Sequence, residues 1–251
     1  MKALRLIRDW IFSIPTLLAF GLSLGFYDLV GRVALLFGRR PFEWVMAALQ
    51  RTLLWTFRFS HVRVKMEDPP KIANGEAYIM VSNHQSMLDV PIFGGLLMRT
   101  FPKYIAKTEL GRWIPSVSLN LTRGGNALID RRDARQALTA IKALALESKE
   151  RGNSIVLFPE GRRSRDGDLL EFQIGGLAML MRSASDMPIV PTVIDGSWKV
   201  FLHNLFPVPF GTTVRVRFGT PIEGPDRGDV NAVMAECKTF ITATLKEWRA
   251  E

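Results

Sequence analysis

The sequence is poor in cysteine and histidine. It has one cysteine, Cys237, and three histidines, at positions 61, 84 and 203. A single cysteine cannot form an internal disulfide, so the composition gives no sign of an oxidising compartment. So few histidines leave little material for a histidine-rich metal site, and we expect no bound metal. The one Gly-x-Ser-x-Gly stretch, residues 21–25, lies inside a long uncharged apolar run and not between a strand and a helix, which argues against a serine hydrolase with a nucleophile elbow.

Long uncharged stretches are also few. The chain has 251 residues, of which 47% are apolar, and a net charge of +9. This apolar content is too high for a disordered basic tail, whereas a polytopic membrane protein would need several uncharged runs of about 20 residues. A basic chain suits an anionic partner, either nucleic acid or a lipid surface with phosphorylated small molecules. Because the basic residues are scattered and form no stripe with stacking aromatics, we expect no nucleic acid partner.

One uncharged run does occur, from Trp10 to Tyr27. As a single helix its 18 residues would be roughly 27 Å long, slightly short of a hydrocarbon core of about 30 Å. Pro15, Gly21 and Gly25 disfavour a straight rod, and basic residues on both flanks give no orientation. The run therefore fits a single transmembrane helix, or a helix or bent helix pair that dips into one leaflet. It also fits, less well, a buried helix of a soluble core or a secretory signal, for which no small-x-small cleavage site follows.

A second helical stretch is expected from Pro41 to about Ser60. It is apolar over much of its surface but carries charged residues, so it fits either an interfacial helix or a helix packed in the core. The sequence thus predicts two parts. Residues 1–60 form an N-terminal membrane-associated helical module, and residues 61–251 form a catalytic domain.

The remainder of the chain alternates short apolar strands with helical patterns. Strands are expected at 61–66, 77–81, 103–106, 127–129, 154–158, 188–194 and 213–218, and helices at about 86–99, 133–150, 173–184 and 229–249. This alternation predicts an α/β fold with a mixed, mostly parallel sheet flanked by helices. Turns are expected at 68–70 and 222–226, and the aromatic-rich segment 198–206 suits either lipid contact or core packing.

A polar cluster from Asn83 to Asp89 follows the strand expected at 77–81. In open α/β sheets, the carboxyl ends of the strands carry ligand chemistry. On one ideal helix, His84 and Asp89 would point about 140° apart, so they meet only if His84 lies in the turn before the helix. Asp89 could then orient His84 as the proton acceptor of a His–carboxylate dyad. The alternative for Asp89 is a capping box in which Ser86 is the N-cap.

Two further clusters place arginines beside glycines. Residues 158–164, Phe-Pro-Glu-Gly-Arg-Arg-Ser, follow the strand expected at 154–158. Their proline and glycine indicate a tight turn in which Arg163 offers a forked donor suited to phosphate, and the alternative is a basic surface turn. Residues 123–131, Arg-Gly-Gly-Asn-Ala-Leu-Ile-Asp-Arg, also suit an anionic ligand, and Lys107 points to the same ligand class.

The order of these motifs resembles that of a known family. Asn-His-x4-Asp, Gly-x5-Arg, Phe-Pro-Glu-Gly-x-Arg-Ser and a late Val-Pro strand are typical of glycerolipid acyltransferases, specifically the 1-acylglycerol-3-phosphate acyltransferase branch. The resemblance covers roughly residues 62–222. It implies that His84 is the catalytic base, with Asp89 as its partner, and that Arg131 contacts the acceptor phosphate. The full substrate-binding set predicted in this way is Lys107, Gly125, Arg131, Glu160, Gly161, Arg163 and Ser164.

The sequence departs from the family pattern at a few positions. Leu128 stands where relatives more often have Phe. Arg162 replaces a small Thr or Ser, and Gln173 stands where relatives often have Lys. The chain thus loses a cation at position 173 and gains one at position 162, within the third motif. These two changes leave the identity of the acceptor head group open.

The resemblance implies a reaction, its partners and a location. A fatty acyl group would pass from acyl-CoA or acyl carrier protein to the sn-2 hydroxyl of 1-acylglycerol-3-phosphate, forming phosphatidic acid, with no bound cofactor. The alternatives are another lysolipid acceptor and a catalytically silent membrane-bound protein. We expect the lipid bilayer, the lysophospholipid and the acyl carrier as partners. We also expect a monotopic or single-pass protein whose catalytic domain lies on the cytoplasmic face of the inner or plasma membrane.

Overall fold

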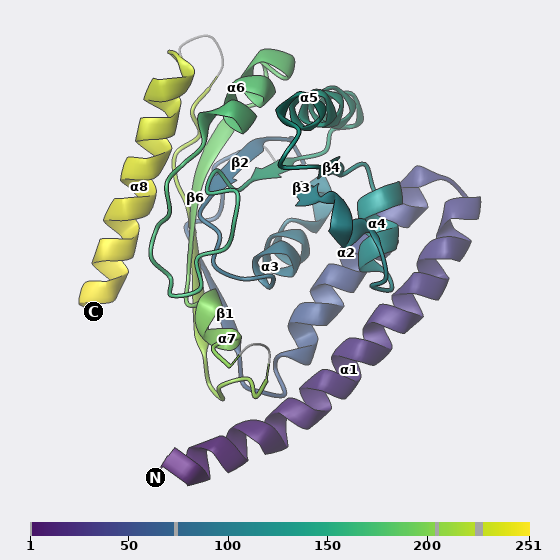
Figure 1. Ribbon diagram of the computed structural model, residues 1–251, viewed down its shortest axis with the longest axis vertical. Helices are drawn as coiled ribbons and strands as arrows, with labels where there is room; N and C mark the ends of the chain where they lie inside the picture. Colours follow the sequence, from purple (N-terminus) through teal and green to yellow (C-terminus); the bar gives the residue numbers. More distant parts are fainter. Residues whose placement is uncertain (1, 73–74, 204–205, 224–227) are drawn as a thin grey trace.

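The fold is built around one central sheet, as Figure 1 shows. The computed structural model describes residues 2–72, 75–203, 206–223 and 228–251. Seven strands are hydrogen-bonded in the order β1-β7-β6-β2-β5-β3-β4. Their bounds are β1 Arg63–Glu67, β2 Ile79–Ser82, β3 Lys103–Lys107, β4 Ala127–Ile129, β5 Ile155–Leu157, β6 Ile189–Asp195 and β7 Thr213–Phe218. Each lies within one or two residues of a strand expected from the sequence.

The sheet is mixed and mostly parallel, as predicted. β2 pairs in parallel with both β5 and β6, and β3 joins β5 to β4 in the same direction. β7 runs antiparallel to β6, and β1 is parallel to β7. The carboxyl ends of β6, β2, β5, β3 and β4 therefore lie along one edge of the sheet.

The long helices also agree with the sequence patterns, whereas the short ones were not expected. The bounds are α1 Lys2–Leu36, α2 Arg39–Thr56, α3 Asp89–Leu96, α4 Val117–Arg123, α5 Ala134–Arg151, α6 Ile174–Ser183, α7 Ser197–Val200 and α8 Val230–Ala250. Short 3-10 turns lie at Met98–Thr100 and Thr108–Gly111. α4 and α7 span only two turns or less, which is too short for a periodic apolar pattern to show.

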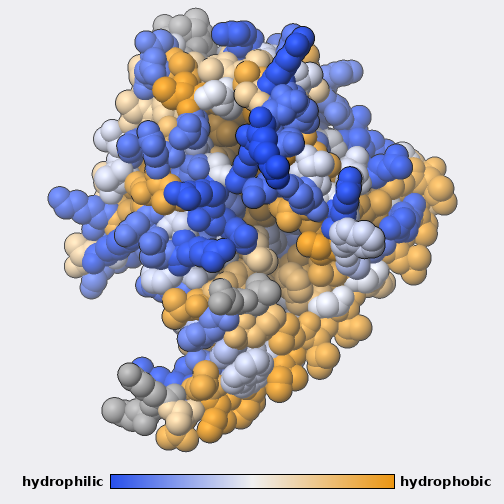
Figure 2. All heavy atoms as spheres, viewed as in Figure 1, coloured by the Kyte–Doolittle hydropathy of each residue, from blue (hydrophilic) through white to orange (hydrophobic). Residues whose placement is uncertain are grey.

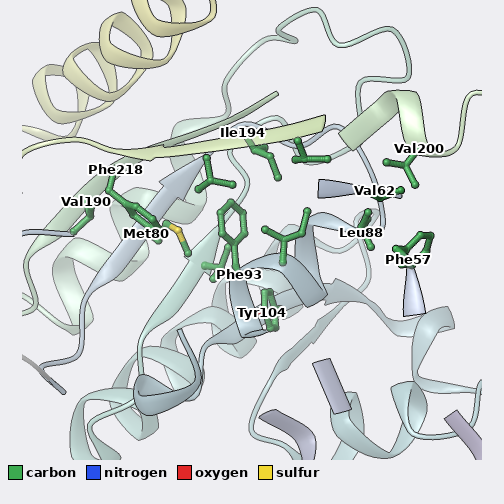
Figure 3. Packing of buried hydrophobic residues seen from close by; sticks show 14 of the residues in the cluster. Phe57, Val62, Met80, Leu88, Phe93, Tyr104, Val190, Ile194, Val200 and Phe218 are labelled. Atoms are coloured by element: carbon green, nitrogen blue, oxygen red, sulfur yellow. The ribbon is translucent and has the colours of Figure 1, made fainter. Parts of the chain in front are cut away.

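Both faces of the sheet are buried. Successive residues of a strand point to opposite faces, so Met80 and Val190 belong to a buried cluster that also includes Phe93 of α3 and Leu88 (Figure 3). Ile79 points the other way, into a cluster formed with α5, α6 and α8. This burial on both sides explains why the central strands are almost uniformly apolar in sequence.

α1 is one continuous helix with Pro15 inside it, so the bent helix pair is wrong. One face of α1 packs on the protein along its length. Ser13 Oγ accepts a hydrogen bond from the Val208 N–H at 2.8 Å, and Asp28 Oδ1 accepts one from the Ser116 N–H at 2.7 Å. α1 is therefore bonded to the domain at two well-separated points and does not stand away from it.

α2 lies between α1 and α3 (Figure 1). It approaches α3 closely at two glycines, because a Cβ on Gly94 would overlap the Gln50 side chain and one on Gly95 would lie 2.8 Å from a methyl of Leu54. The expectation of a core-packed helix is thus confirmed for one face. Trp44 and Trp55 on its other faces remain exposed. The predicted boundary at residue 60 stays a prediction.

Two smaller expectations touch residues outside the described ranges. The aromatic-rich segment 198–206 packs on the core through Phe201 and Phe206, while Leu202 is exposed, and residues 204–205 lie outside the described part. Residues 224–227 of the turn expected at 222–226 are likewise outside it. Core packing is therefore the role shown for the aromatic part of the first segment.

Candidate active site

The polar clusters that follow β2 and β5 meet at one edge of the sheet. β2 and β5 are hydrogen-bonded neighbours and run in the same direction, so their carboxyl ends lie side by side. The turn after β2 carries His84, and the turn after β5 carries Glu160. The two turns are joined directly, because the His84 N–H donates to Glu160 Oε1 at 2.7 Å and the Ser164 N–H donates to the His84 carbonyl at 2.8 Å.

His84 and Asp89 form the predicted dyad. His84 lies in the turn before α3 and Asp89 is its first residue, and His84 Nδ1 is 2.8 Å from Asp89 Oδ2. With a carboxylate as acceptor, Nδ1 carries the proton and the lone pair of Nε2 is left to accept another. The His84 side chain is 16% exposed and that of Asp89 is fully buried. The geometry is that of a general base with a buried orienting partner.

Asp89 is also held by the backbone of the turn. Its Oδ2 accepts hydrogen bonds from the N–H groups of Gln85 at 2.7 Å and Ser86 at 2.9 Å. The capping interaction and the dyad, which the sequence presents as alternatives, are thus made by the same oxygen atom. Ser86 is not the N-cap of α3, because the helix begins at Asp89 and Leu88 holds the cap position without a side-chain bond. Ser86 Oγ instead accepts from the Leu88 N–H at 3.2 Å.

The turn after β5 fixes the orientation of the imidazole. The Phe158 ring stacks on His84, with centroids 4.0 Å apart and an interplanar angle of 14°. Gly161 adopts a φ of +65°, in the left-handed region that favours glycine, and lets the chain reverse there. One side of the His84 ring is therefore covered, which restricts how the base can move.

Glu160 is a positioning residue in this structure. The side chain is buried, and while Oε1 accepts from His84, Oε2 accepts from the Leu170 N–H at 2.9 Å. Burial raises the pKa of Glu160, and the two backbone donors oppose that rise. Both carboxylate oxygens of Glu160 already accept hydrogen bonds, and a carboxylate repels phosphate. Glu160 is therefore poorly suited to bind an anionic acceptor directly. Ser164 is buried too, and its Oγ bonds Asp166 Oδ1 at 2.9 Å.

Three of the predicted cations lie along the same edge. Arg163 follows β5, Lys107 ends β3, and Arg131 follows β4, and all are exposed. At ordinary strand spacing, β5 lies about 5 Å and β4 about 14 Å from β2. Arg163 lies beside the turn that carries His84, because the next residue, Ser164, donates its N–H to the His84 carbonyl. Partial burial lowers the pKa of Arg131 and the neighbouring Glu109 opposes this, but a guanidinium stays charged at neutral pH.

Gly125 does not belong to this edge. It precedes β4 and so lies at the amino end of the strand, whereas Arg131 follows the carboxyl end. Its φ is +75°, and a Cβ there would overlap the Arg39 guanidinium. The binding role of Gly125 stays a prediction, and its conformation and the close approach of Arg39 give a separate reason for the glycine.

Several contacts that support the site were not predicted from the sequence. The Asn83 side chain makes a pair of 2.9 Å hydrogen bonds with the backbone of Ile194, which ties the turn after β2 to β6. Gln85 bonds Asp195 at 2.9 Å, and Arg249 reaches the same carboxylate from the last helix. Nothing in the sequence signals these contacts, because the partners lie more than 50 positions apart. Within the described ranges, no group of three His, Cys, Asp or Glu side chains could hold a metal ion.

Comparisons with known proteins agree with this geometry. Residues 63–195 match the family described as Acyltransferase. The chain is 30% identical over 192 residues to the 1-acyl-sn-glycerol-3-phosphate acyltransferase beta of Homo sapiens, covering 74% of this chain and 66% of that protein. It is 29% identical over 189 residues to the 1-acyl-sn-glycerol-3-phosphate acyltransferase of Salmonella typhimurium, covering 74% of each.

Among solved structures, the chain resembles the 1-acyl-sn-glycerophosphate (LPA) acyltransferase of Thermotoga maritima. The TM-score is 0.76 at 21% identity, and the match covers 98% of both chains. At this identity the likeness shows the fold. Some relatives extend well beyond the match, since the chain spans 51% of the length of the 1-acyl-sn-glycerol-3-phosphate acyltransferase of Limnanthes douglasii.

Proposed function

Because the chain belongs to the acyltransferase family, we propose that it transfers a fatty acyl group from an acyl thioester to the sn-2 hydroxyl of 1-acylglycerol-3-phosphate, forming phosphatidic acid. The observation that carries this proposal is the His84–Asp89 dyad at the carboxyl edge of β2, with Nε2 of His84 free to accept a proton. The acyl donor is acyl-CoA or an acylated carrier protein, both anionic, which suits the positive charge of the chain.

His84 acts as the general base. An alcohol is a poor nucleophile at neutral pH, so Nε2 takes the hydroxyl proton while the oxygen attacks the thioester carbonyl. A new C–O bond forms, the C–S bond then breaks, and the proton passes to the departing thiolate. Asp89 keeps Nδ1 protonated and stabilises the imidazolium that exists between these steps. No covalent intermediate on the chain is needed.

The cations of the edge bind the acceptor phosphate. Arg163 lies in the turn after β5, next to Ser164, which is bonded to His84, and it offers a forked guanidinium, while Lys107 and Arg131 extend the positive edge beyond it. Holding the phosphate places the sn-2 hydroxyl against Nε2, and this positioning lowers the entropic part of the barrier. The backbone N–H groups of Arg162 and Arg163 make no hydrogen bond within the described residues, so they are available to the developing oxyanion.

Two departures from the family pattern, Arg162 and Gln173, bear on the acceptor head group, and both lie at the site. Arg162 is exposed in the turn after β5. The Gln173 N–H donates to the Pro159 carbonyl at 2.8 Å, which puts Gln173 beside the same turn. The Arg162 guanidinium therefore supplies a positive charge close to where relatives carry their lysine, and a phosphate acceptor remains favoured.

The test is an assay of the purified chain with a labelled acyl thioester and a panel of lysolipids. We expect phosphatidic acid from lysophosphatidic acid, with kcat/KM at least about tenfold above that for lysophosphatidylcholine or lysophosphatidylethanolamine, whose phosphodiesters carry less charge. Acyl-CoA and acyl carrier protein are supplied in parallel arms. Preference for a zwitterionic acceptor would contradict the head group, and absence of product with every acceptor would contradict the acyl transfer.

The outer face of α1 is the proposed membrane contact. Figure 2 shows apolar residues gathered along the side where α1 runs in Figure 1. Exposed apolar residues recur every three or four positions along the helix: Leu4, Ile7, Ile11, Ile14, Leu18, Leu22, Phe26, Leu29, Val33 and Leu36. Trp113 is 95% exposed in the loop before Ser116, whose N–H bonds α1. An apolar stripe of this length exceeds what a soluble monomer exposes.

The packing of α1 favours a helix that lies in the membrane surface. By length and composition, residues 3–36 are sufficient to cross a bilayer. The opposite face of α1, however, is hydrogen-bonded to the catalytic domain from Ser13 to Asp28. A spanning orientation would draw the polar loops at Val208 and Ser116 into the hydrocarbon, where unsatisfied backbone groups are costly. We therefore place α1 in one leaflet, which makes the protein monotopic.

Charge on the outer face of α1 is expected to detach the protein from lipid. The double variant Leu18→Asp/Leu22→Asp leaves the packed face intact but puts two carboxylates where apolar side chains would enter the leaflet. We expect binding to vesicles of phosphatidylethanolamine and phosphatidylglycerol to fall about a hundredfold in a sedimentation assay. Leu146→Asp, at an exposed apolar position of α5, is the matched control and should bind as the wild type does. An equal loss of vesicle binding in the double variant and in the control would contradict the assignment of the outer face of α1 as the membrane contact.

A further inference from the structure

The last turn of α8 reaches the loop that carries the arginines after β5. Arg249 Nη2 donates to the Gly167 carbonyl at 2.6 Å and to Asp195 Oδ1 at 3.3 Å. Its other terminal nitrogen donates to Asp168 Oδ1 at 3.2 Å. One guanidinium thus binds both the end of this loop and the carboxyl end of β6. These two segments are not adjacent in the sequence.

Gln85 donates to two of the same acceptors, the Gly167 carbonyl and Asp195 Oδ1. Its Nε2 lies 2.9 Å from Asp195 Oδ1 and 3.4 Å from the Gly167 carbonyl oxygen. Gln85 is 3% exposed, so this amide is enclosed and its hydrogen bonds are not shared with solvent. Gln85 and Arg249 therefore form one network with Gly167 and Asp195, which we call the loop latch.

The loop latch is one residue from the catalytic base. Gln85 follows His84, and its backbone N–H binds Asp89 Oδ2 at 2.7 Å. The side chain of Gln85 thus connects the turn that holds the dyad to the loop that holds the arginines. One residue therefore contributes its backbone N–H to the dyad and its side-chain amide to the latch.

The other end of the loop is already attached to the catalytic turn. Glu160 and Ser164 bond the backbone of His84 on both sides. At Gly167 the chain adopts a φ of +87°, and a Cβ there would overlap the Trp198 indole. Arg162 and Arg163 therefore lie between the two residues, 160 and 164, that are bonded to the catalytic turn, and the latch holds the loop again at residue 167.

We propose that Arg249 and Gln85 are positioning residues that hold the loop of residues 160–170 against the catalytic turn, so that Arg162 and Arg163 stay in place for an anionic acceptor. The part of this proposal that concerns the acceptor rests on the proposed function. An arginine on a loose loop loses conformational entropy each time it binds, and a pre-ordered one does not. Loss of the latch therefore weakens acceptor binding more than it weakens proton transfer.

The chain offers a matched control for general loosening of α8. Arg215 of β7 also binds the end of α8, through Glu251, and it binds Glu67 of β1 at 2.9 Å. These contacts join α8 to the far side of the sheet and do not include the loop. Arg215→Gln thus removes an ion pair at the same helix end while leaving the loop latch intact.

Trypsin cleavage tests the latch without any assay of activity. The loop carries three trypsin sites, at Arg162, Arg163 and Arg165. We expect Arg249→Ala and Gln85→Ala to raise the cleavage rate at these sites about tenfold, because local opening becomes easier. Arg249→Lys, which keeps the charge but not the fork, should fall in between, and Arg215→Gln should match the wild type. Unchanged cleavage in Arg249→Ala, or equal cleavage in Arg215→Gln, would overturn the proposal.

Steady-state kinetics then tests the consequence for the acceptor. In Arg249→Ala we expect KM for lysophosphatidic acid to rise about tenfold, with KM for the acyl thioester within about twofold of wild type and the pH midpoint of kcat unmoved. Equal rises in KM for lysophosphatidic acid and for the acyl thioester, together with a lower Tm, would show that Arg249 has a merely structural role. That result would overturn the proposal. An inactive wild type with the expected cleavage pattern would instead reject the proposed function and leave the latch standing.

Discussion

Replacement of His84 with alanine is expected to lower kcat for acyl transfer by about three orders of magnitude. The substitution removes the imidazole whose Nε2 is free to take a proton while Nδ1 binds the buried Asp89 at 2.8 Å. The acceptor hydroxyl would then have to lose its proton to water. The measurement is the formation of labelled phosphatidic acid under saturating donor and acceptor.

Two controls separate chemistry from folding in this experiment. Thermal unfolding should show that His84→Ala remains folded, because the contacts that hold the turn are made by the backbone of His84. Asp89→Asn should retain some activity, about a hundredfold below wild type, because its amide oxygen can still accept from Nδ1 but a neutral amide stabilises the imidazolium less than a carboxylate does. Equal product from His84→Ala and wild type would reject His84 as the base.

The second large effect is expected at Glu160, where Gln is nearly the same shape. The Glu160 carboxylate accepts the His84 N–H at 2.7 Å and the Leu170 N–H at 2.9 Å. A glutamine offers one acceptor oxygen and turns an NH₂ group toward the other donor, so a buried backbone N–H is left unsatisfied. We expect a loss of about 1–3 kcal/mol in the free energy of unfolding and a fall of about 10- to 100-fold in kcat.

The kinetic pattern distinguishes a positioning role for Glu160 from a binding role. A positioning residue that acts through the His84 backbone lowers kcat, and KM for the acceptor changes little. A residue that touches the acceptor raises that KM and leaves kcat near wild type. Glu160→Asp is the companion variant, since it keeps the charge but shortens the side chain and should also fail to span both donors. A pure KM effect in Glu160→Gln would contradict the positioning role.

The regular elements could be predicted from the sequence because their signal is local. β4 and β7 were predicted at their observed residues, and α5, α6 and α8 within one residue at each end. Buried parallel strands are continuous apolar runs between turn residues, and the helices carry an apolar face at a period near 3.6. The N-cap of α3 was predicted wrongly. Ser86 has the right side chain for a cap, but its Oγ binds Leu88 just before the helix begins.

Residue roles were harder to predict, because a motif gives the residues without their partners. Arg163 and Glu160 come from one motif, yet their surroundings differ. Arg163 is an exposed cation, whereas both carboxylate oxygens of Glu160 accept hydrogen bonds from backbone N–H groups. Gly125 and Arg131 likewise come from one motif but lie at opposite ends of β4. The binding roles of these residues stay predictions, because the motif does not show which of them contacts a ligand.

The sequence by itself determined the fold class, the strands and long helices, and the identity of the His84–Asp89 dyad, because apolar periodicity and motif spacing are properties of neighbouring residues. Only the tertiary structure decided that α1 is one helix docked along the domain, that Glu160 clamps the catalytic turn, and that Arg249 reaches Gly167 and Asp195. Each of these depends on contacts between segments distant in the chain. Such contacts are set by how helices and strands pack, and no local pattern encodes them.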